Sequence, residues 1–334
     1  MPSVFILGAG GWGTALAVMC VKNGHSVALW SPFKEELEAI LRDGENTKLL
    51  PGVPVPADIG LTGSLDGVAS ADAVVLAVPS FAVRETARRL KGLLKPGSVV
   101  VNVAKGLEED TLRRLSEAIA EELPGCRVAV LSGPSHAEEV SRGVPTAVVS
   151  ASKSKHTALF VQQLFMTPSF RIYVNNDIVG VELGGALKNI IALAAGICDG
   201  LGLGDNTKAA LMTRGITEMA RLGVALGGSA QTFAGLAGIG DLIVTCTSMH
   251  SRNRRAGIFI GEGLSAKQAI EKVGMTVEGY RTTLAAYKLS QRAGIEMPIV
   301  NECYRILFEG KDTREAIEDL MTRRGRHETE DAWV

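Results

Sequence analysis

Three glycines placed directly after a short apolar run are the feature that most constrains this sequence. Residues 4–7 read VFIL, and Gly8, Gly10 and Gly13 follow with the spacing G-x-G-x-x-G. A further apolar segment and the strand-like run SVALW come next. A strand, a tight glycine turn and a helix in this order place backbone amides at a helix N-terminus, where a phosphate can bind. We therefore predict a dinucleotide-binding βαβ unit; a glycine turn that binds nothing is the alternative.

Short apolar runs alternate with amphipathic segments from Val4 to about Asn176. The runs are continuous and rich in β-branched residues, which is typical of strands buried on both faces of a sheet. Predicted strands cover residues 4–7, 26–30, 71–78, 98–104, 126–131 and 145–151, and predicted helices cover residues 13–22, 33–42, 81–91, 110–122 and 154–165. Strands that alternate with helices indicate a parallel sheet with right-handed crossovers.

The strand pattern stops after about Ile178, and the rest of the chain is expected to be helical. Predicted helices cover residues 181–200, 206–227, 265–274, 279–294 and 298–310. A chain of 334 residues exceeds the usual size of a single hydrophobic core. We therefore predict an α/β fold: a Rossmann-type doubly wound sheet in residues 1–177, followed by an all-helical C-terminal domain in residues 178–334.

The end of the predicted second strand bears on which dinucleotide is bound. Folds that prefer NAD usually place an Asp or Glu there, and its carboxylate accepts a hydrogen bond from the ribose. This chain instead reads Trp30-Ser31-Pro32-Phe33-Lys34. Since no carboxylate follows the strand to repel a 2′-phosphate and Lys34 is nearby, we expect NADPH to be accepted, and to be preferred if Lys34 pairs with that phosphate. Lys34 is then either a partner of the phosphate or a solvated surface charge.

A lysine in the middle of an apolar helix is the strongest candidate for chemistry. In the segment LGGALKNIIALAAGI, residues 183–197, Lys188 and Asn189 are the only polar residues. Burial favours the neutral form of an amine, so the pKa of Lys188 should fall below its reference value of about 10.4. Proton exchange with a carbonyl or alkoxide oxygen then becomes feasible. A lysine at a domain edge whose ammonium reaches solvent is the other interpretation.

A carboxylate and a hydroxyl follow in the segment GLAGIGDLIVTCTS, residues 235–248. Asp241 stands at an expected helix start, and Thr245 lies one turn further on the same face. Asp in this position commonly caps a helix. A carboxylate close to Lys188 would also orient its ammonium, and the two roles are compatible.

Three loops supply further candidates. The stretch SRNRR, residues 251–255, could bind phosphate oxygens through its guanidinium groups or form a solvated basic turn. Lys105 with Gly106, and Gly133 with Ser135, each follow a predicted strand. They are expected at the carboxyl edge of the sheet, where open α/β folds bind ligands. The segment after Gly133 reads equally as an ordinary helix start.

Charge, cysteines and histidines argue against several classes of protein. Lys and Arg number 35 against 36 Asp and Glu, so no strong field favours nucleic acid or an anionic membrane. The five cysteines form no C-x-x-C pair, which favours a reducing, cytoplasmic location. The histidines show no metal-ligand spacing. We expect no metal site, no nucleic-acid partner and no membrane span.

Motifs along nearly the whole chain are similar to those of one enzyme family. In order, they read GAGGWGTALA, AVPS, KGLE, SGPSHAEE, GGALKNIIALAAGICDGLGLGDNTKAAL, GLAGIGDLIVTCTSMHSRNRR, VEGYRT and EMPI. In these motifs the chain closely resembles the bacterial NAD(P)-dependent sn-glycerol-3-phosphate dehydrogenases. The resemblance implies reversible reduction of dihydroxyacetone phosphate to sn-glycerol 3-phosphate with NADPH or NADH, which supplies the glycerol backbone of phospholipids. It also implies a cytoplasmic enzyme that forms a homodimer.

The resemblance further implies roles for individual residues. Lys188 would donate the proton to the ketone oxygen, with Lys105, Asp241 and Thr245 completing the catalytic set. The substrate-binding residues would be Lys105, Gly133, Ser135, Lys188, Asn189, Asp241, Ser251, Arg252 and Asn253. The cofactor-binding residues would be Gly8, Gly10, Gly11, Trp12, Gly13, Phe33, Lys105, Ala137, Arg252, Val277 and Glu278. Many relatives carry a polar or basic pair where this chain has Pro32-Phe33, which leaves the preference between the two dinucleotides open.

Two other assignments share parts of this plan. β-Hydroxyacid and 6-phosphogluconate dehydrogenases also use a lysine on a helix, but they place an asparagine one turn after it. This chain has Ala192 at that position, and Asn189 is adjacent to the lysine. A non-catalytic dinucleotide sensor is the alternative from another class, and its second domain would have no need of a buried lysine.

Overall fold

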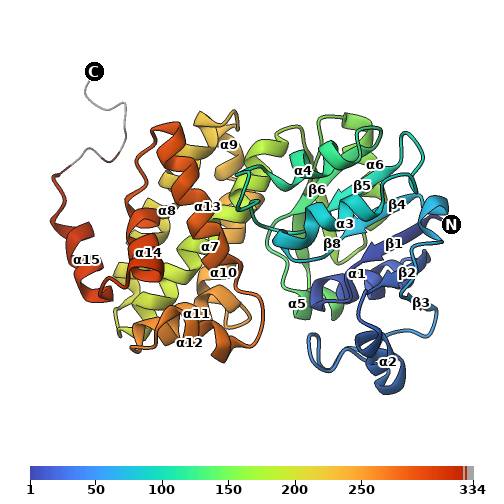
Figure 1. Ribbon diagram of the computed structural model, residues 1–334, viewed down its shortest axis with the longest axis horizontal. Helices are drawn as coiled ribbons and strands as arrows, with labels where there is room; N and C mark the ends of the chain where they lie inside the picture. Colours follow the sequence, from blue (N-terminus) through green and yellow to red (C-terminus); the bar gives the residue numbers. More distant parts are fainter. Residues whose placement is uncertain (326–327, 329–334) are drawn as a thin grey trace.

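A sheet flanked by helices occupies the first half of the chain, and helices alone make up the second half (Figure 1). The computed structural model describes residues 1–325 and 328. The strands are β1 (Ser3–Leu7), β2 (Ser26–Trp30), β3 (Ile59–Thr62), β4 (Ala73–Leu76), β5 (Val99–Asn102), β6 (Arg127–Ser132), β7 (Thr146–Ala151) and β8 (Phe170–Asn175). The helices of this half are α1 (Gly11–Lys22), α2 (Lys34–Asp43), α3 (Val83–Arg89), α4 (Leu115–Glu122), α5 (Ala137–Ser141) and α6 (Lys155–Phe165), with short turns η1 (Val68–Ser70) and η2 (Ser80–Ala82).

The helical half begins directly after the last strand. Its helices are α7 (Ile178–Gly200), α8 (Asp205–Ala225), α9 (Ala230–Phe233), α10 (Asp241–Thr247), α11 (Arg252–Gly261), α12 (Ala266–Val273), α13 (Glu278–Ala293), α14 (Pro298–Tyr304) and α15 (Thr313–Thr322), with irregular turns η3 (Leu236–Gly240) and η4 (Arg305–Glu309). The predicted order of an α/β sheet followed by helices is confirmed.

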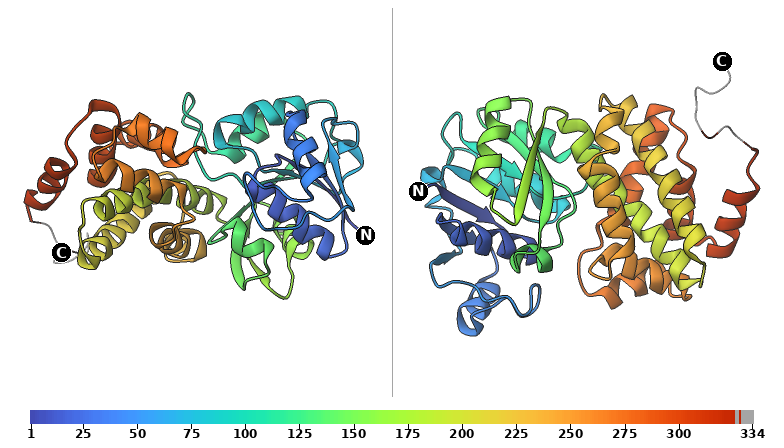
Figure 2. Two further views of the ribbon diagram at one scale, coloured as in Figure 1. Left: turned by 90° about the horizontal axis from the view of Figure 1, so that it is seen from below. Right: turned by 180° about the vertical axis from the view of Figure 1, so that it is seen from behind.

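The sheet has eight strands in the order β3-β2-β1-β4-β5-β6-β7-β8. Its strand side chains alternate between two apolar clusters, one on each face. Val4 and Ile6 of β1 pack against α1 and α6, whereas Phe5 and Leu7 pack against α3 and α4. Figure 2 shows helices on both faces of the sheet. The strand order reverses between β1 and β4, and this switch point is where doubly wound folds bind ligands.

The sheet is longer than the sequence predicts, and one pairing runs in the other direction. β3 and β8 were not expected, because both are edge strands without a continuous apolar run. β7 is antiparallel to β6, whereas the prediction was a fully parallel sheet. The link between them contains only the five-residue helix α5, which advances the chain about 7.5 Å. A parallel connection usually runs back along the strand in a crossover helix, about 20 Å for a six-residue strand, and α5 is too short to form one.

Helix α7 is the core of the helical half. Its side chains are buried almost throughout, and the helix lies against α8, α10, α11 and α13. A Cβ atom at Gly196 would lie 2.0 Å from the carbonyl oxygen of Arg254, so only glycine permits this close crossing with α11. By length and composition α7 could cross a membrane, but 94% of its apolar window is buried within the protein.

Helix α7 also crosses the carboxyl edge of the sheet. The last strand ends at Asn175, and Asp177 caps the new helix by accepting a hydrogen bond from the amide of Gly180 at 2.8 Å. A Cβ atom at Gly185 would lie 2.7 Å from Ser132 Oγ, at the end of β6. The middle of α7 therefore faces the loops that follow β5 and β6.

Candidate active site

The loops after β5 and β6 meet at the ammonium group of Lys105. Lys105 Nζ donates hydrogen bonds to the carbonyl oxygen of Gly133 at 2.8 Å and to Ser135 Oγ at 3.2 Å. It also donates to Asp241 Oδ2 at 2.8 Å, from the sheet half to the helical half. The two loops that the sequence placed at the carboxyl edge of the sheet are therefore joined to α10.

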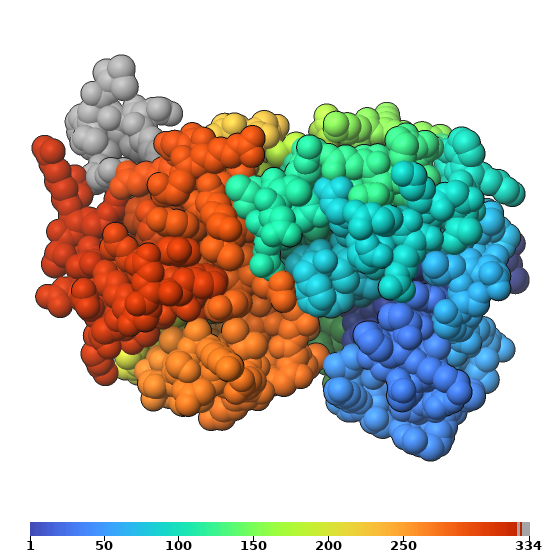
Figure 3. All heavy atoms as spheres, viewed as in Figure 1, coloured from blue at the N-terminus to red at the C-terminus, as the bar shows by residue number. Residues whose placement is uncertain are grey.

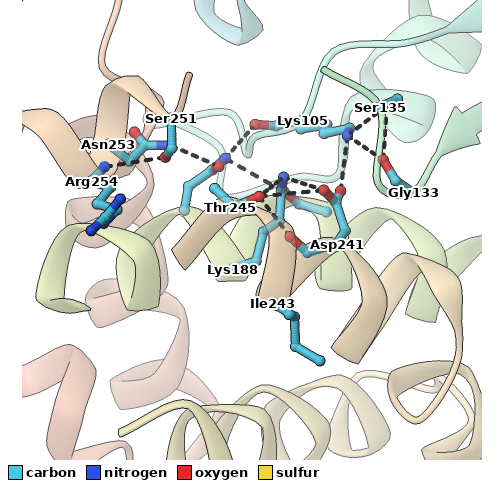
Figure 4. A network of polar contacts seen from close by, with 12 residues as sticks. Lys105, Gly133, Ser135, Lys188, Asp241, Ile243, Thr245, Ser251, Asn253 and Arg254 are labelled. Atoms are coloured by element: carbon cyan, nitrogen blue, oxygen red, sulfur yellow. Dashed lines mark hydrogen bonds and ion pairs between the residues drawn. The ribbon is translucent and has the colours of Figure 1, made fainter. Parts of the chain in front are cut away.

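Lys188 lies on the buried side of the same carboxylate (Figure 4). Lys188 is 5% exposed. The predicted burial of its ammonium group is therefore confirmed, and a side chain that reaches solvent is excluded. Lys188 Nζ donates to Asp241 Oδ1 at 2.5 Å and to Thr245 Oγ1 at 2.7 Å. The two lysines thus hold the two oxygens of one carboxylate.

Helix α10 delivers Asp241 and Thr245 to this place. Its first residue is Asp241, and Thr245 follows one turn later with its hydroxyl donating to the Asp241 carbonyl oxygen at 2.6 Å. The preceding turn η3 lies tightly against α7, since a Cβ atom at Gly184 would be 2.5 Å from the carbonyl oxygen of Ala237. No side chain caps α10. The Asp241 carboxylate therefore binds ammonium groups instead of the helix amides.

The two lysines differ in how many of their hydrogens are committed. An ammonium group has three hydrogens to donate. Lys105 Nζ has three acceptors among the described residues, namely Gly133, Ser135 and Asp241. Lys188 Nζ has two, which are Asp241 and Thr245. One hydrogen of Lys188 is therefore available to a further acceptor such as a substrate oxygen.

Burial and charge shift the pKa values of the cluster. Burial is the main cause that lowers the pKa of Lys188 to about 8; Asp241 opposes this shift and Lys105 adds to it. Burial acts to raise the pKa of Asp241, but Lys105 and Lys188 together hold it below its usual range. An ionised carboxylate thus faces an amine that can gain or lose a proton near neutral pH.

Two asparagines connect this cluster to α11 and α13. Asn189 Nδ2 donates to the Lys105 carbonyl oxygen at 3.1 Å, and Asn189 Oδ1 accepts from Asn253 Nδ2 at 2.9 Å. Asn253 Oδ1 in turn accepts from the Gly279 amide at 2.8 Å. These contacts hold the loop after β5 against α7, α11 and α13. Substrate contacts of the two asparagines remain a prediction.

The SRNRR segment starts a helix, and its arginines differ in their partners. Ser251 caps α11, because its Oγ accepts from the amide of Arg254 at 3.2 Å. The Arg254 guanidinium is paired with Asp199, with 2.7 Å between Nε and Oδ2. Arg252 is exposed and has no hydrogen bond or ion pair within residues 1–325 and 328, although Glu278 and Glu138 interact with it electrostatically. Of these two arginines, Arg252 is the one able to receive an anion.

The glycine turn fits the phosphates of a dinucleotide. Gly8 has a φ of +117°, and a Cβ atom there would lie 2.6 Å from the Ala77 carbonyl oxygen. A Cβ atom at Gly13 would lie 1.9 Å from the Gly8 carbonyl oxygen. Gly10 is different, because nothing lies within 4 Å of its Cβ position and no side chain caps α1. The first amides of α1 are thus open to an approaching phosphate.

The other residues predicted to bind the cofactor lie around this turn and differ in how far they are exposed. A Cβ atom at Gly11 would lie 2.5 Å from the Leu49 carbonyl oxygen and 4.0 Å from Ala137 Cβ, so the starts of α1 and α5 lie close together. The Trp12 ring lies beside the ring of Phe170 in β8, with 6.5 Å between the two ring centroids. Phe33 is 59% exposed at the start of α2. The space-filling view shows a hollow between the helical half and the blue segment that contains α2 (Figure 3).

Val277 and Glu278 come from the helical half, at the start of α13. Val277 is buried, and Glu278 reaches across to the end of the AVPS motif. Glu278 Oε1 accepts from the Ser80 amide at 3.0 Å, and Ser80 Oγ donates to Glu278 Oε2 at 2.5 Å. The sequence motifs give no sign of this contact, because the two residues are 198 positions apart.

The end of β2 also differs from the expectation. Lys34 is exposed and pairs with Glu38, with 3.1 Å between Nζ and Oε1. A carboxylate does lie close to the strand end, since Ser31 Oγ donates to Glu36 Oε2 at 2.7 Å. The Glu36 carboxylate was not expected here, because Glu36 lies in the next helix and does not directly follow the strand. Within the described part of the chain, no cluster of His, Cys, Asp or Glu could hold a metal ion.

Comparison with known proteins covers both halves of the chain. Residues 3–158 match the family described as NAD-dependent glycerol-3-phosphate dehydrogenase N-terminus, and residues 177–318 match the C-terminus of the same family. The glycerol-3-phosphate dehydrogenase [NAD(P)+] of Moorella thermoacetica is 58% identical over 98% of this chain and 98% of its own length. The enzyme of that name from Desulfitobacterium hafniense is 55% identical over 99% of this chain and 94% of its own length.

Solved structures show the same architecture. The crystal structure of glycerol-3-phosphate dehydrogenase from Coxiella burnetii superimposes with a TM-score of 0.93 at 41% identity, covering 96% of this chain and 99% of that one. The glycerol-3-phosphate dehydrogenase of Saccharomyces cerevisiae gives a TM-score of 0.82 at 26% identity, over 97% of this chain and 100% of that one. Both comparisons extend over the sheet and the helical half together.

Proposed function

Because this chain belongs to the NAD-dependent glycerol-3-phosphate dehydrogenase family, we propose that Lys188 exchanges the proton in the reduction of dihydroxyacetone phosphate to sn-glycerol 3-phosphate. The observation that carries this proposal is a buried ammonium with one uncommitted hydrogen at the carboxyl edge of a dinucleotide-binding sheet. Lys105, by contrast, has its three donors satisfied within the protein.

The cofactor is NADH or NADPH, as in the relatives named for NAD(P)+. A bound nicotinamide dinucleotide supplies the hydride that reduces C2 of the ketone. The open amides at the start of α1 bind its pyrophosphate, and Gly8, Gly10 and Gly13 allow the backbone to approach it. Glu278 of α13 binds Ser80, which follows the strand β4 next to β1.

Lys188 gives its proton to the carbonyl oxygen during reduction and takes it back from the hydroxyl during oxidation. Asp241 and Thr245 keep the amine oriented while it changes charge, because each accepts one of its hydrogens. Lys105 adds a fixed positive charge on the other side of Asp241, which favours negative charge developing on the substrate oxygen. The cluster is therefore complementary to an alkoxide.

Arg252 binds the phosphate of the substrate in this proposal. Its guanidinium has no protein partner among the described residues, and its neighbours Ser251 and Asn253 are held by the start of α11 and by Asn189. A phosphate forms strong, charge-assisted hydrogen bonds with a guanidinium. Gly133 and Ser135 line the substrate from the sheet half.

Replacement of Lys188 by Ala tests the catalytic role. Loss of a general acid typically lowers kcat by a factor of about 10²–10⁴. We expect that loss in the reduction of dihydroxyacetone phosphate, with unchanged dissociation constants for NADH and NADPH. Lys267→Ala removes an exposed lysine from α12 and serves as the control. Unchanged turnover in Lys188→Ala contradicts the proposal, because another group would then have to exchange the proton.

The cellular role follows from the product. sn-Glycerol 3-phosphate carries the glycerol backbone of phospholipids, and we infer that the enzyme supplies it from a cytoplasmic location. We also infer a homodimer. Light scattering coupled to gel filtration tests the dimer, since a mass equal to one 35.2 kDa chain would contradict it.

A further inference from the structure

A carboxylate from α2 reaches the end of β2 beside the glycine turn. Ser31 directly follows β2 and is 1% exposed. Its hydroxyl donates to Glu36 Oε2 at 2.7 Å and accepts from the amide of Phe33 at 3.2 Å. Glu36 is half-buried. The first turn of α2 is thus folded back so that its carboxylate is fixed at the strand end.

The end of β2 is part of the dinucleotide site. The amide of Gly8 donates to the Trp30 carbonyl oxygen at 2.8 Å, so the strand end is bonded directly to the phosphate-binding turn. In doubly wound folds the adenosine ribose lies at this position, and an acidic side chain there accepts a hydrogen bond from its hydroxyl. Glu36 supplies, from a helix, the carboxylate that the residues after β2 lack.

The positive charge of Lys34 does not offset this carboxylate. Lys34 is 84% exposed at its side chain and pairs with Glu38. Residues 34–38 read KEELE, so one lysine and three glutamates leave a local charge of 1 − 3 = −2. A 2′-phosphate at the strand end would add further negative charge to this cluster, whereas a 2′-hydroxyl would find an acceptor.

We propose that Glu36, positioned by the hydroxyl of Ser31, selects NADH over NADPH. This inference rests on the proposed function and names the dinucleotide that the same site prefers. The preference arises because the Glu36 carboxylate accepts a hydrogen bond from the ribose of NADH and repels the 2′-phosphate of NADPH. Ser31 acts through Glu36 and is a positioning residue.

Direct binding to the full chain tests this proposal without turnover. Titration calorimetry should show NADH binding about ten-fold or more tightly than NADPH, as expected for like charges a few ångströms apart. The fragments 5′-AMP and 2′,5′-ADP should show the same order, because they differ only in the 2′-phosphate. In Glu36→Gln we expect tighter binding of NADPH and of 2′,5′-ADP, so that both ratios approach one.

Four further variants separate the carboxylate from the general charge of α2. Glu35→Gln removes one negative charge from the same exposed turn and should leave the ratios unchanged. Ser31→Ala should shift the binding ratios in the same direction as Glu36→Gln. Ser31→Thr keeps a hydroxyl and should show the wild-type ratios. In the double variant Ser31→Ala/Glu36→Gln the ratio should equal that of Glu36→Gln alone.

Either of two results would overturn the proposal. One is a wild-type chain that binds NADPH as tightly as NADH, and the other is a ratio of the two dissociation constants that Glu36→Gln leaves unchanged. Failure of the proposed function looks different. A chain that binds neither dinucleotide, or that fails to reduce dihydroxyacetone phosphate with either, would contradict the enzyme assignment itself.

Discussion

The most informative single residue is Lys188, because its surroundings act on its protonation in opposite directions. Burial favours the neutral amine and Asp241 favours the ammonium, and the balance gives a pKa of about 8. Asp241 stays ionised over the same range, since Lys105 and Lys188 hold its pKa low. One group of the cluster therefore titrates near neutral pH while the carboxylate beside it keeps its charge.

This balance predicts opposite pH profiles for the two directions of the reaction. Reduction needs protonated Lys188, so its kcat/KM should be level below about pH 8 and fall about ten-fold per pH unit above it. Oxidation needs the neutral amine, so its kcat/KM should rise with pH and level off above about pH 8. Initial rates from about pH 7 upward avoid ionisation of the substrate phosphate, whose pKa is about 6. Profiles that bend in the same direction would contradict proton transfer by Lys188.

Arg252 provides a second prediction at the residue scale. Arg252→Ala should raise KM for dihydroxyacetone phosphate by about ten- to a hundred-fold, because a charge-assisted hydrogen bond contributes about 1.5–3 kcal/mol. KM for unphosphorylated dihydroxyacetone should hardly change. Arg292→Ala, which removes an exposed arginine from α13, is the matched control. Equal effects on both substrates would argue against a phosphate contact.

At the scale of elements, close helix contacts fix where the catalytic groups point. α7 crosses α11 at Gly196 and Gly257, where Cβ atoms would each lie 2.0 Å from a carbonyl oxygen of the other helix. This crossing places Lys188 and Asn189 of α7 near the start of α11, which carries Arg252. The glycines therefore determine the distance between the two substrate-binding regions.

Gly196→Ala should accordingly destabilise the protein. The added methyl group meets backbone of α11, which cannot move aside as a flexible side chain would. Overpacking of this kind costs about 1–3 kcal/mol, which thermal unfolding would detect as a lower Tm. Gly125→Ala is the control, because the nearest atom to its Cβ position is 3.7 Å away. An unchanged Tm for Gly196→Ala would mean that the crossing is looser than described.

At the scale of the whole molecule, buried charge joins the sheet half to the helical half. Arg114, which precedes α4, donates from Nη1 to Glu182 Oε2 of α7 at 2.7 Å. The Ser116 amide donates to Glu182 Oε1 at 2.8 Å. Burial raises the pKa of Glu182, and Arg114 opposes that shift. Glu182 lies on the same helix as Lys188, and its ion pair with Arg114 secures α7 to the sheet half.

Removal of the cation should weaken this joint in a pH-dependent manner. Arg114→Ala leaves the Glu182 carboxylate buried without its counter-ion, which costs about 3–5 kcal/mol. A carboxyl group whose pKa is raised in the folded state binds more protons when folded, so stability falls as pH rises. The loss of Tm should therefore be larger at about pH 7.5 than at about pH 5.5. Arg113→Ala, at an exposed ion pair with Glu121, should change Tm little at either pH.

The sequence by itself determined the kind of fold and most of the chemical groups. The glycine spacing after an apolar strand predicts phosphate binding, because only glycine fits the φ of Gly8 and the close approach at Gly13. An amine surrounded by apolar residues on one helix predicts a lysine with a lowered pKa, and Lys188 is buried as expected. These are local properties of the chain, carried by periodicity, composition and backbone sterics.

Only the tertiary structure decided how those groups are paired. It places Lys105, Lys188 and Asp241 in one cluster from three separate elements and leaves a free hydrogen on Lys188 alone of the two lysines. It also brings the Glu36 carboxylate back to the end of β2, where the residues that directly follow the strand supply none. Such contacts depend on where a chain returns in space. No periodicity or local motif of the sequence encodes which distant residues meet in the fold.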